Sequence, residues 1–124
     1  MKKYTFEITP VPKPRMSSTD RWKPSARAQK YWGYKKHLLY LANLQNFSMP
    51  FCRYHLTFHL PMPASWKSDK RSALRGMPHQ QTPDKDNLEK GFLDALLTDD
   101  SGVWDGRVTK LWDDKGRIEI TIDD

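Results

Sequence analysis

Residues 51–60 limit the fold of this chain more strongly than any other segment of the sequence. Tyr54, Leu56, Phe58 and Leu60 alternate with polar side chains there. Side chains two positions apart lie on the same face of a β-strand, so the segment predicts a strand with one buried face. The domain must therefore contain a sheet, and another layer must cover its apolar face.

The same alternation recurs toward both ends of the chain. Residues 3–9 predict a first strand, and residues 108–112 and 118–122 predict two more. The sequence Asp-Asp-Lys-Gly at 113–116 predicts a hairpin turn between the last two strands.

Two segments between the strands place apolar residues at helical spacing instead. These segments, 26–46 and 86–98, predict amphipathic helices. The segments 10–25 and 61–83 contain several prolines and are expected to be irregular loops. The order strand, helix, strand, helix, strand, strand predicts a single α+β domain over residues 1–124, with a mixed sheet and two helices packed on one face.

The charge balance favours a polyanionic partner. The net charge is +6, the sequence pI is about 9.5, and the mean hydropathy of −0.83 indicates a thin core. With the single cysteine Cys52, no internal disulfide can form. No segment has the roughly 20 apolar residues of a membrane span, and no signal peptide is apparent, so we expect a cytoplasmic protein without membrane contacts.

The chemically informative segment is Asp-Lys-Asp-Asn-Leu-Glu-Lys, residues 84–90. Asp84 and Asp86 lie where a loop becomes a helix, Lys90 follows Asp86 by one helical turn, and Asp105 precedes a strand. Carboxylate oxygens are the ligands that Mg²⁺ selects, and a metal-activated water can attack a phosphodiester. The alternative is structural, because Asp84 or Asp86 could cap the helix, Asp86 with Glu89 fits a capping box, and Asp105 could belong to a turn.

The same residues carry a resemblance to a known family. Asp-x-Asp-Asn-Leu-x-Lys, the helical Leu-Asp-Ala-Leu at 93–96, and Val-Trp-Asp at 103–105 are similar to the RusA-type Holliday-junction resolvases of bacteria and their phages. The proline-rich basic segment 12–15 and the segment 66–79 also resemble that family. The likeness extends over nearly the whole chain.

The resemblance implies a Mg²⁺- or Mn²⁺-dependent endonuclease that resolves four-way DNA junctions by paired nicks, acting as a homodimer in DNA recombination and repair. It implies metal binding by Asp84, Asp86 and Asp105 and a catalytic role for Lys90. The family often has two consecutive acidic residues at the third position, whereas Trp104 precedes Asp105 here. The third ligand is therefore Asp105 alone, or Asp105 helped by the nearby Asp99 or Asp100.

Two basic loops are expected to contact DNA phosphates. The candidates are Lys13, Arg15, Arg21, Lys23, Lys67, Lys70, Arg71 and Arg75. Trp22 and Trp66, interleaved with these cations, could stack on exposed bases, and His79 could touch DNA or be an ordinary loop residue. Two other functions stay open: a noncatalytic nucleic-acid-binding protein, and a nuclease for other branched or single-stranded DNA.

Overall fold

A computed structural model of the chain describes residues 2–15, 23–49, 53–97 and 100–123. The elements in chain order are β1 (Lys2–Phe6), α1 (Ala26–Leu44), β2 (Arg53–Pro61), α2 (Ser68–Leu74), α3 (Lys85–Leu96), β3 (Gly106–Asp113) and β4 (Arg117–Asp123). The predicted α+β class is confirmed, with one mixed sheet of four strands.

The strands lie in the order β1–β4–β2–β3. β2 is a central strand, antiparallel to β4 and parallel to β3. The hairpin predicted between β3 and β4 is therefore wrong, because the chain reverses at 113–116 but β2 lies between the two strands. A turn motif fixes only the reversal of the chain. The turn does not decide which strands pair with β3 and β4. Both strands pair with β2, whose Leu56 and Phe58 are fully buried at the centre of the sheet.

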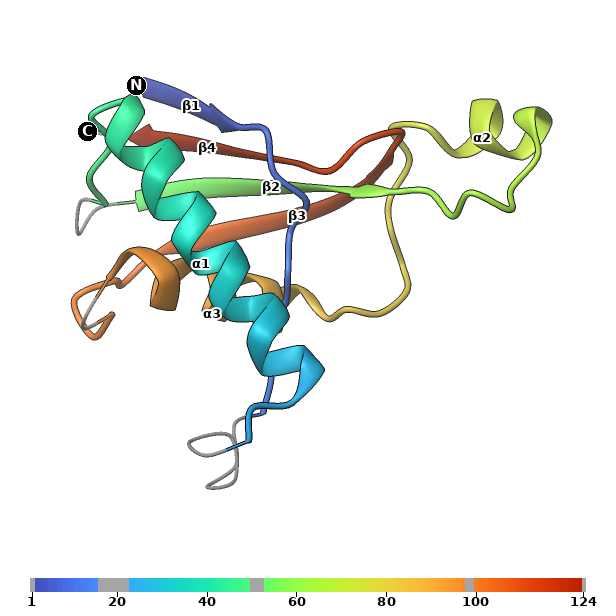
Figure 1. Cartoon of the computed structure of the whole chain (residues 1–124). Coiled ribbons are helices and arrows are strands. Elements are labelled where there is room, and N and C mark those ends of the chain that lie inside the picture. The colour runs from blue at the N-terminus through green and yellow to red at the C-terminus, as the bar shows by residue number, and fades with distance from the viewer. Residues whose placement is uncertain (1, 16–22, 50–52, 98–99, 124) are drawn as a thin grey trace.

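Helices α1 and α3 cover one face of the sheet, as predicted, and pack on each other (Figure 1). Ser25 caps α1 by accepting a hydrogen bond from the backbone N–H of Ala28 at 3.1 Å. Tyr31 and Leu38 of α1 are buried against the apolar sheet side chains. The core joins both helices to the sheet, and Phe92 of α3 packs its ring against Phe6 and Phe58.

The segment between β2 and α3 is more ordered than the predicted loop. It includes the short helix α2, which lies at the end of an arm away from the other helices (Figure 1). After α2 the chain returns beside β3, where Gly76 N–H donates to the carbonyl of Trp112 and His79 N–H donates to that of Lys110. The return segment therefore extends the sheet past β3 and leads directly to α3.

None of the helices in the described part of the chain is long and apolar enough to cross a membrane.

Candidate active site

The turn that leads into α3 is fixed by Lys110 of β3. Its ammonium group donates hydrogen bonds to the carbonyl oxygens of Gln81 and Pro83, both at 2.7 Å. Burial lowers the pKa of Lys110, while the nearby Asp84 carboxylate acts in the opposite direction. Lys110 therefore anchors the backbone immediately before Asp84 and lies within electrostatic reach of its side chain.

Asp84 and Asp86 are exposed at the N-terminus of α3. Asp84 occupies the N-cap position, but its side chain makes no capping hydrogen bond. The Asp86 carboxylate accepts a hydrogen bond from the N–H of Asn87 at 3.0 Å. Among the residues that the structure describes, neither carboxylate has an ion-pair partner within 4.0 Å. Both retain oxygens that a ligand can reach.

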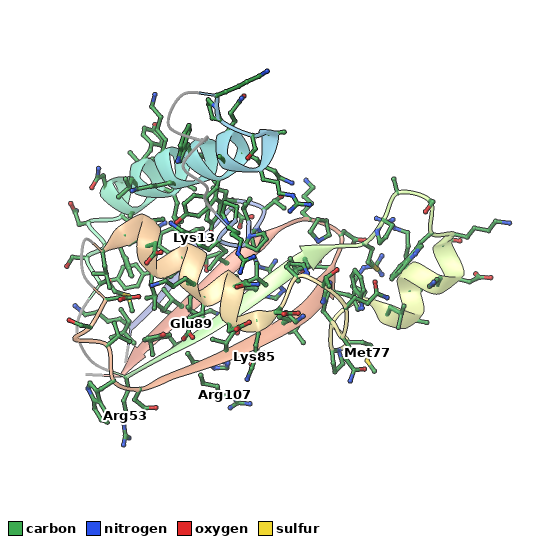
Figure 2. The ribbon with its side chains drawn as sticks, turned by 90° about the horizontal axis from the view of Figure 1, so that it is seen from below. Lys13, Arg53, Met77, Lys85, Glu89 and Arg107 are labelled. Atoms are coloured by element: carbon green, nitrogen blue, oxygen red, sulfur yellow. The ribbon has the colours of Figure 1, made fainter. Side chains whose placement is uncertain are left out.

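The capping box considered for Asp86 and Glu89 is absent. Asp86 lies within the first turn of α3 and is not its N-cap. Glu89 accepts a hydrogen bond from the hydroxyl of Tyr54 on β2 instead. Figure 2 shows Glu89 between α3 and the sheet. Asp86 and Glu89 therefore do not form the reciprocal capping contacts that a structural role would require.

Lys90 is exposed and contacts acidic residues other than Asp86. Its ammonium group lies 3.3 Å from the Asp94 carboxylate and 3.1 Å from that of Asp100. The hydrogen bonds to Asp100 and then Asp94 raise the pKa of Lys90. Although Lys90 follows Asp86 by one helical turn, its ion pairs are with Asp94 and Asp100.

Asp105 lies just before β3 and forms an ion pair with Arg53 at the start of β2, at 3.0 Å. The Arg53 guanidinium also lies 5.6 Å from the ring centroid of Trp104. Sequence reasoning missed Arg53, because its contact depends on the parallel pairing of β2 with β3. Trp104, which stands where the family often has an acidic residue, thus places an aromatic ring beside Arg53, the cation that pairs with Asp105.

Tyr54 links the beginning of β3 to α3. A Cβ atom on Gly106 would lie 2.4 Å from the Tyr54 ring, so this glycine allows the strand to cross the ring closely. Burial raises the pKa of Tyr54, and the hydrogen bond to Glu89 adds to that effect. Around this ring lies a cavity of about 310 Å³ whose lining includes Glu89, Asp100 and Asp105. Sequence reasoning missed Tyr54, which it assigned to the core, and the role of Glu89.

The predicted ligands thus occur in two groups. Asp84 and Asp86 lie at the N-terminus of α3, and Asp105 lies with Glu89 and Asp100 around the neighbouring cavity. In the described ranges, no three acidic, histidine or cysteine side chains are close enough together to hold a metal ion. The chemistry of the donors fits a hard divalent cation, because exposed carboxylates predominate in both groups. Asp99 lies outside the described residues.

The first basic segment lies against α3. The backbone N–H of Lys13 donates to the carbonyl of Asn87 at 3.0 Å, and its ammonium group lies 3.4 Å from the Asp94 carboxylate. Arg15 and Lys23 are exposed. Arg21 and Trp22 lie outside the described residues.

The second basic segment is the arm that carries α2. Lys67 and Lys70 are exposed, with the Lys70 ammonium 4.1 Å from the ring centroid of Trp66. Arg75 binds Asp114 through two hydrogen bonds, and Arg71 lies 3.7 Å from the same carboxylate. These two guanidinium groups hold the arm to the β3–β4 turn.

Two aromatic residues of this arm pack inward. Trp66 packs at 4.8 Å from Trp112, and His79 is buried with its ring 4.1 Å from Trp112. Trp66 and His79 therefore both pack against Trp112.

A small basic α+β fold with carboxylates and a lysine around one helix defines a class of protein suited to phosphodiester chemistry. Comparison with known proteins identifies the class more narrowly. Residues 6–123 match the family described as Endodeoxyribonuclease RusA, and the chain belongs to this family of nucleases. The chain is also 40% identical over 70 residues to the uncharacterized protein YqaN of Bacillus subtilis (strain 168). That match covers 50% of this chain and spans 49% of the length of YqaN.

Proposed function

We propose that this protein is a Mg²⁺-dependent, structure-selective endonuclease that resolves four-way DNA junctions by paired symmetric nicks. The observation that carries the proposal is the pair Asp84 and Asp86 at the start of α3, in a chain that matches the RusA family over residues 6–123. Both are exposed, the Asp84 side chain makes no capping hydrogen bond, and neither carboxylate has an ion-pair partner within 4.0 Å among the described residues. Acidic side chains gain from the dipole at a helix N-terminus, but neither carboxylate is held by an ion pair among the described residues, so both are available to a cation.

Asp84, Asp86 and Asp105 are the proposed metal ligands, and Mn²⁺ is an alternative to Mg²⁺. A bound divalent cation would supply Lewis acidity for phosphodiester hydrolysis. Asp100 and Glu89 line the same cavity as Asp105. Asp105 must then exchange its contact with Arg53 for the cation, which is a small cost for an ion pair whose side chains are 60% and 49% exposed.

Lys90 is proposed to act on the phosphate that is cut. Its ammonium group can exchange Asp94 and Asp100 for a phosphate oxygen, because the side chain is 52% exposed and surface ion pairs are weak. A positive charge placed there stabilises the negative charge that develops on the phosphate oxygens.

A branched substrate requires a broad basic surface and two active sites. Lys13, Arg15, Lys23, Lys67 and Lys70 are the proposed phosphate contacts that remain exposed or half-exposed. Arg71 and Arg75 would contribute only if DNA displaced them from Asp114, and Arg21 is proposed from sequence alone. Two like strands are cut symmetrically, so we propose a two-fold homodimer, acting in the cytoplasm of a bacterial or phage-infected cell.

The decisive experiment uses a labelled synthetic four-way junction incubated with and without Mg²⁺. We expect symmetric nicks that require the cation, and we expect Asp86→Asn to abolish them without loss of folding. Junction binding in EDTA should persist or strengthen in this variant, because one negative charge facing phosphate is removed. The matched control is Asp69→Asn, which changes an exposed aspartate in the first turn of α2 and should cut normally.

The other outcomes separate the alternatives. Cutting of flaps or single strands without junction resolution indicates a nuclease of different substrate choice. Binding without any cutting indicates a noncatalytic nucleic-acid-binding protein. An unfolded Asp86→Asn variant indicates that the carboxylate stabilises α3.

A further inference from the structure

A basic cleft includes Asp84 in its lining and shares no lining residue with the Tyr54 cavity. The cleft has a volume of about 420 Å³ and lies between the segment 11–15, the first turns of α1 and the segment 82–87. Its charged lining residues are Lys13, Arg15, Arg27, Lys30 and Asp84. The cations thus outnumber the single carboxylate, and the excess of positive charge lies directly beside a proposed metal ligand.

Most of these cations have no acidic partner among the residues that the structure describes. Lys13 lies 3.4 Å from Asp94, whereas Arg15, Arg27 and Lys30 have no carboxylate within 4.0 Å in the described part of the chain. Like charges gathered on one surface repel each other, so the arrangement costs stability in the free protein. An anion entering the cleft relieves that repulsion.

The cleft is held by backbone contacts. The Lys13 N–H donates to the Asn87 carbonyl, and a Cβ atom on Gly91 would lie 2.8 Å from the carbonyl oxygen of Val11. The Tyr31 hydroxyl of α1 donates to the Gly91 carbonyl at 2.9 Å. Figure 2 shows Lys13 between α1 and α3. Both α1 and the segment 11–13 thus contact α3 at Gly91, so the backbones that carry these cations keep fixed positions relative to α3.

We infer that this cleft binds the sugar-phosphate backbone of a single nucleic-acid strand next to the position of cleavage, with Arg27 and Lys30 as strand-binding residues. The inference rests on the proposed function, because it takes the anion to be the strand that is cut. A volume of this order is that of a small-ligand site, so it admits a short stretch of the backbone of one strand. The N-terminus of α3 adds a partial positive charge at the wall that includes Asn87.

The test compares two double variants that remove the same charge. Arg27→Ala with Lys30→Ala changes the cleft, and Lys36→Ala with Lys115→Ala changes exposed lysines elsewhere. Alanine is the best helix former, so the substitutions in α1 should leave the thermal unfolding temperature nearly unchanged. Arg15→Ala tests the opposite wall independently, in case the α1 variant is altered in folding.

Binding is measured in EDTA by fluorescence anisotropy, with a labelled single-stranded oligonucleotide and a labelled four-way junction at several salt concentrations. For the cleft variant we expect the dissociation constant to rise about tenfold or more. The slope of log K against log salt for the single strand should fall by about 1.4, from two lost phosphate contacts. The control should change both quantities by less than half as much. In cutting assays the cleft variant should have a raised KM and a nearly unchanged kcat.

The outcomes distinguish this inference from the proposed function. If the two double variants bind the oligonucleotides equally well, strand binding in the cleft is refuted, even if the wild type resolves junctions. Selective loss of strand binding in the cleft variant supports the cleft, even if the wild type cuts no junction. Failure of the wild type to bind either oligonucleotide overturns both, as does tight binding of an acidic polypeptide in their place.

Discussion

Lys90 differs from Lys85, the other lysine of α3, in having two carboxylates within ion-pair distance among the described residues. Asp94 and Asp100 orient its ammonium group beside the cavity lined by Asp105. Arg53 forms an ion pair with the Asp105 carboxylate, so a side chain of the protein neutralises this proposed metal ligand. These contacts show how individual charges are balanced when substrate is absent.

We predict that Lys90→Ala reduces the cleavage rate by about 100-fold or more, because it removes a charge that stabilises the transition state. The free energy of unfolding should change little, because the side chain is exposed. Single-turnover cleavage measures the first quantity and urea unfolding the second. Lys36→Ala, which changes an exposed lysine of α1 outside both proposed sites, is the control. Near-normal cleavage by the Lys90 variant would show that the residue serves only its ion pairs.

At the scale of the elements, the segment 11–13 crosses α3 closely at Gly91. Gly91 permits this contact, because an added Cβ atom would lie within 3.0 Å of backbone atoms of Val11 and Lys13. Gly33, in the middle of α1, has no such neighbour, since a Cβ atom added there would meet nothing within 4 Å. Both glycines lie within helices, but only Gly91 is needed to avoid a steric clash with another segment.

We predict that Gly91→Ala destabilises the protein by about 1–3 kcal/mol, because the neighbouring backbone must move. Gly33→Ala should stabilise it by about 0.5–1 kcal/mol, because alanine loses less backbone entropy on folding. Urea unfolding of both variants gives the comparison directly. Stabilisation of similar size in both would contradict the close contact of the segment 11–13 with α3.

At the scale of the whole molecule, the sheet face opposite the helices carries a polar network. His59 is buried, and its ring contacts the carboxylates of Glu119 and Asp113 at 2.5 and 3.2 Å. Lys3 of β1 forms an ion pair with Glu119 at 2.5 Å. Residues of β1, β2, β3 and β4 thus share one cluster of charges, which makes the sheet sensitive to acid.

Burial would raise the pKa of Glu119, but hydrogen bonds from Lys3 and His59 outweigh it and lower the pKa to about 2 from the ordinary 4.5. A lowered folded-state pKa means that the carboxylate contributes stability above pH 4.5 and loses it as the pH falls toward 2. We predict that the stability difference between wild type and Glu119→Gln shrinks over this range. Urea unfolding at successive pH values measures it, with the exposed Glu7→Gln as control. A difference independent of pH would contradict the prediction.

The outer surface of α1 carries exposed apolar side chains, among them Trp32, Tyr40 and Leu44, at 45%, 59% and 64% exposure. Aromatic residues are enriched at the centres of protein interfaces. We predict that a second copy of this chain covers them, and that Tyr40→Glu converts a dimer to a monomer. Sedimentation at micromolar concentration measures the change. Met77→Glu, an exposed apolar residue of the arm, should leave the dimer intact. A wild type that sediments as a monomer would refute the dimer.

Much of the architecture could be predicted from the pattern of side chains. Alternation located β1, β2 and β4, and the spacing of Tyr31, Tyr34 and Leu38 located α1, because burial of one face imposes those periods. Pattern could not detect α2, in which no residue is buried. Charge and spacing also selected the segment 84–90, but not the partners of its side chains.

The sequence by itself determined the fold class, the basic surface and the segment with Asp84, Asp86 and Lys90, because these follow from local periodicity and from residue chemistry. The tertiary structure alone decided that β2 separates β3 from β4, that Arg53 neutralises Asp105, and that Lys110 anchors the turn before Asp84. Each of these depends on strand pairing between segments far apart in the chain. Local pattern does not encode such pairing, since it is set by how the whole core packs.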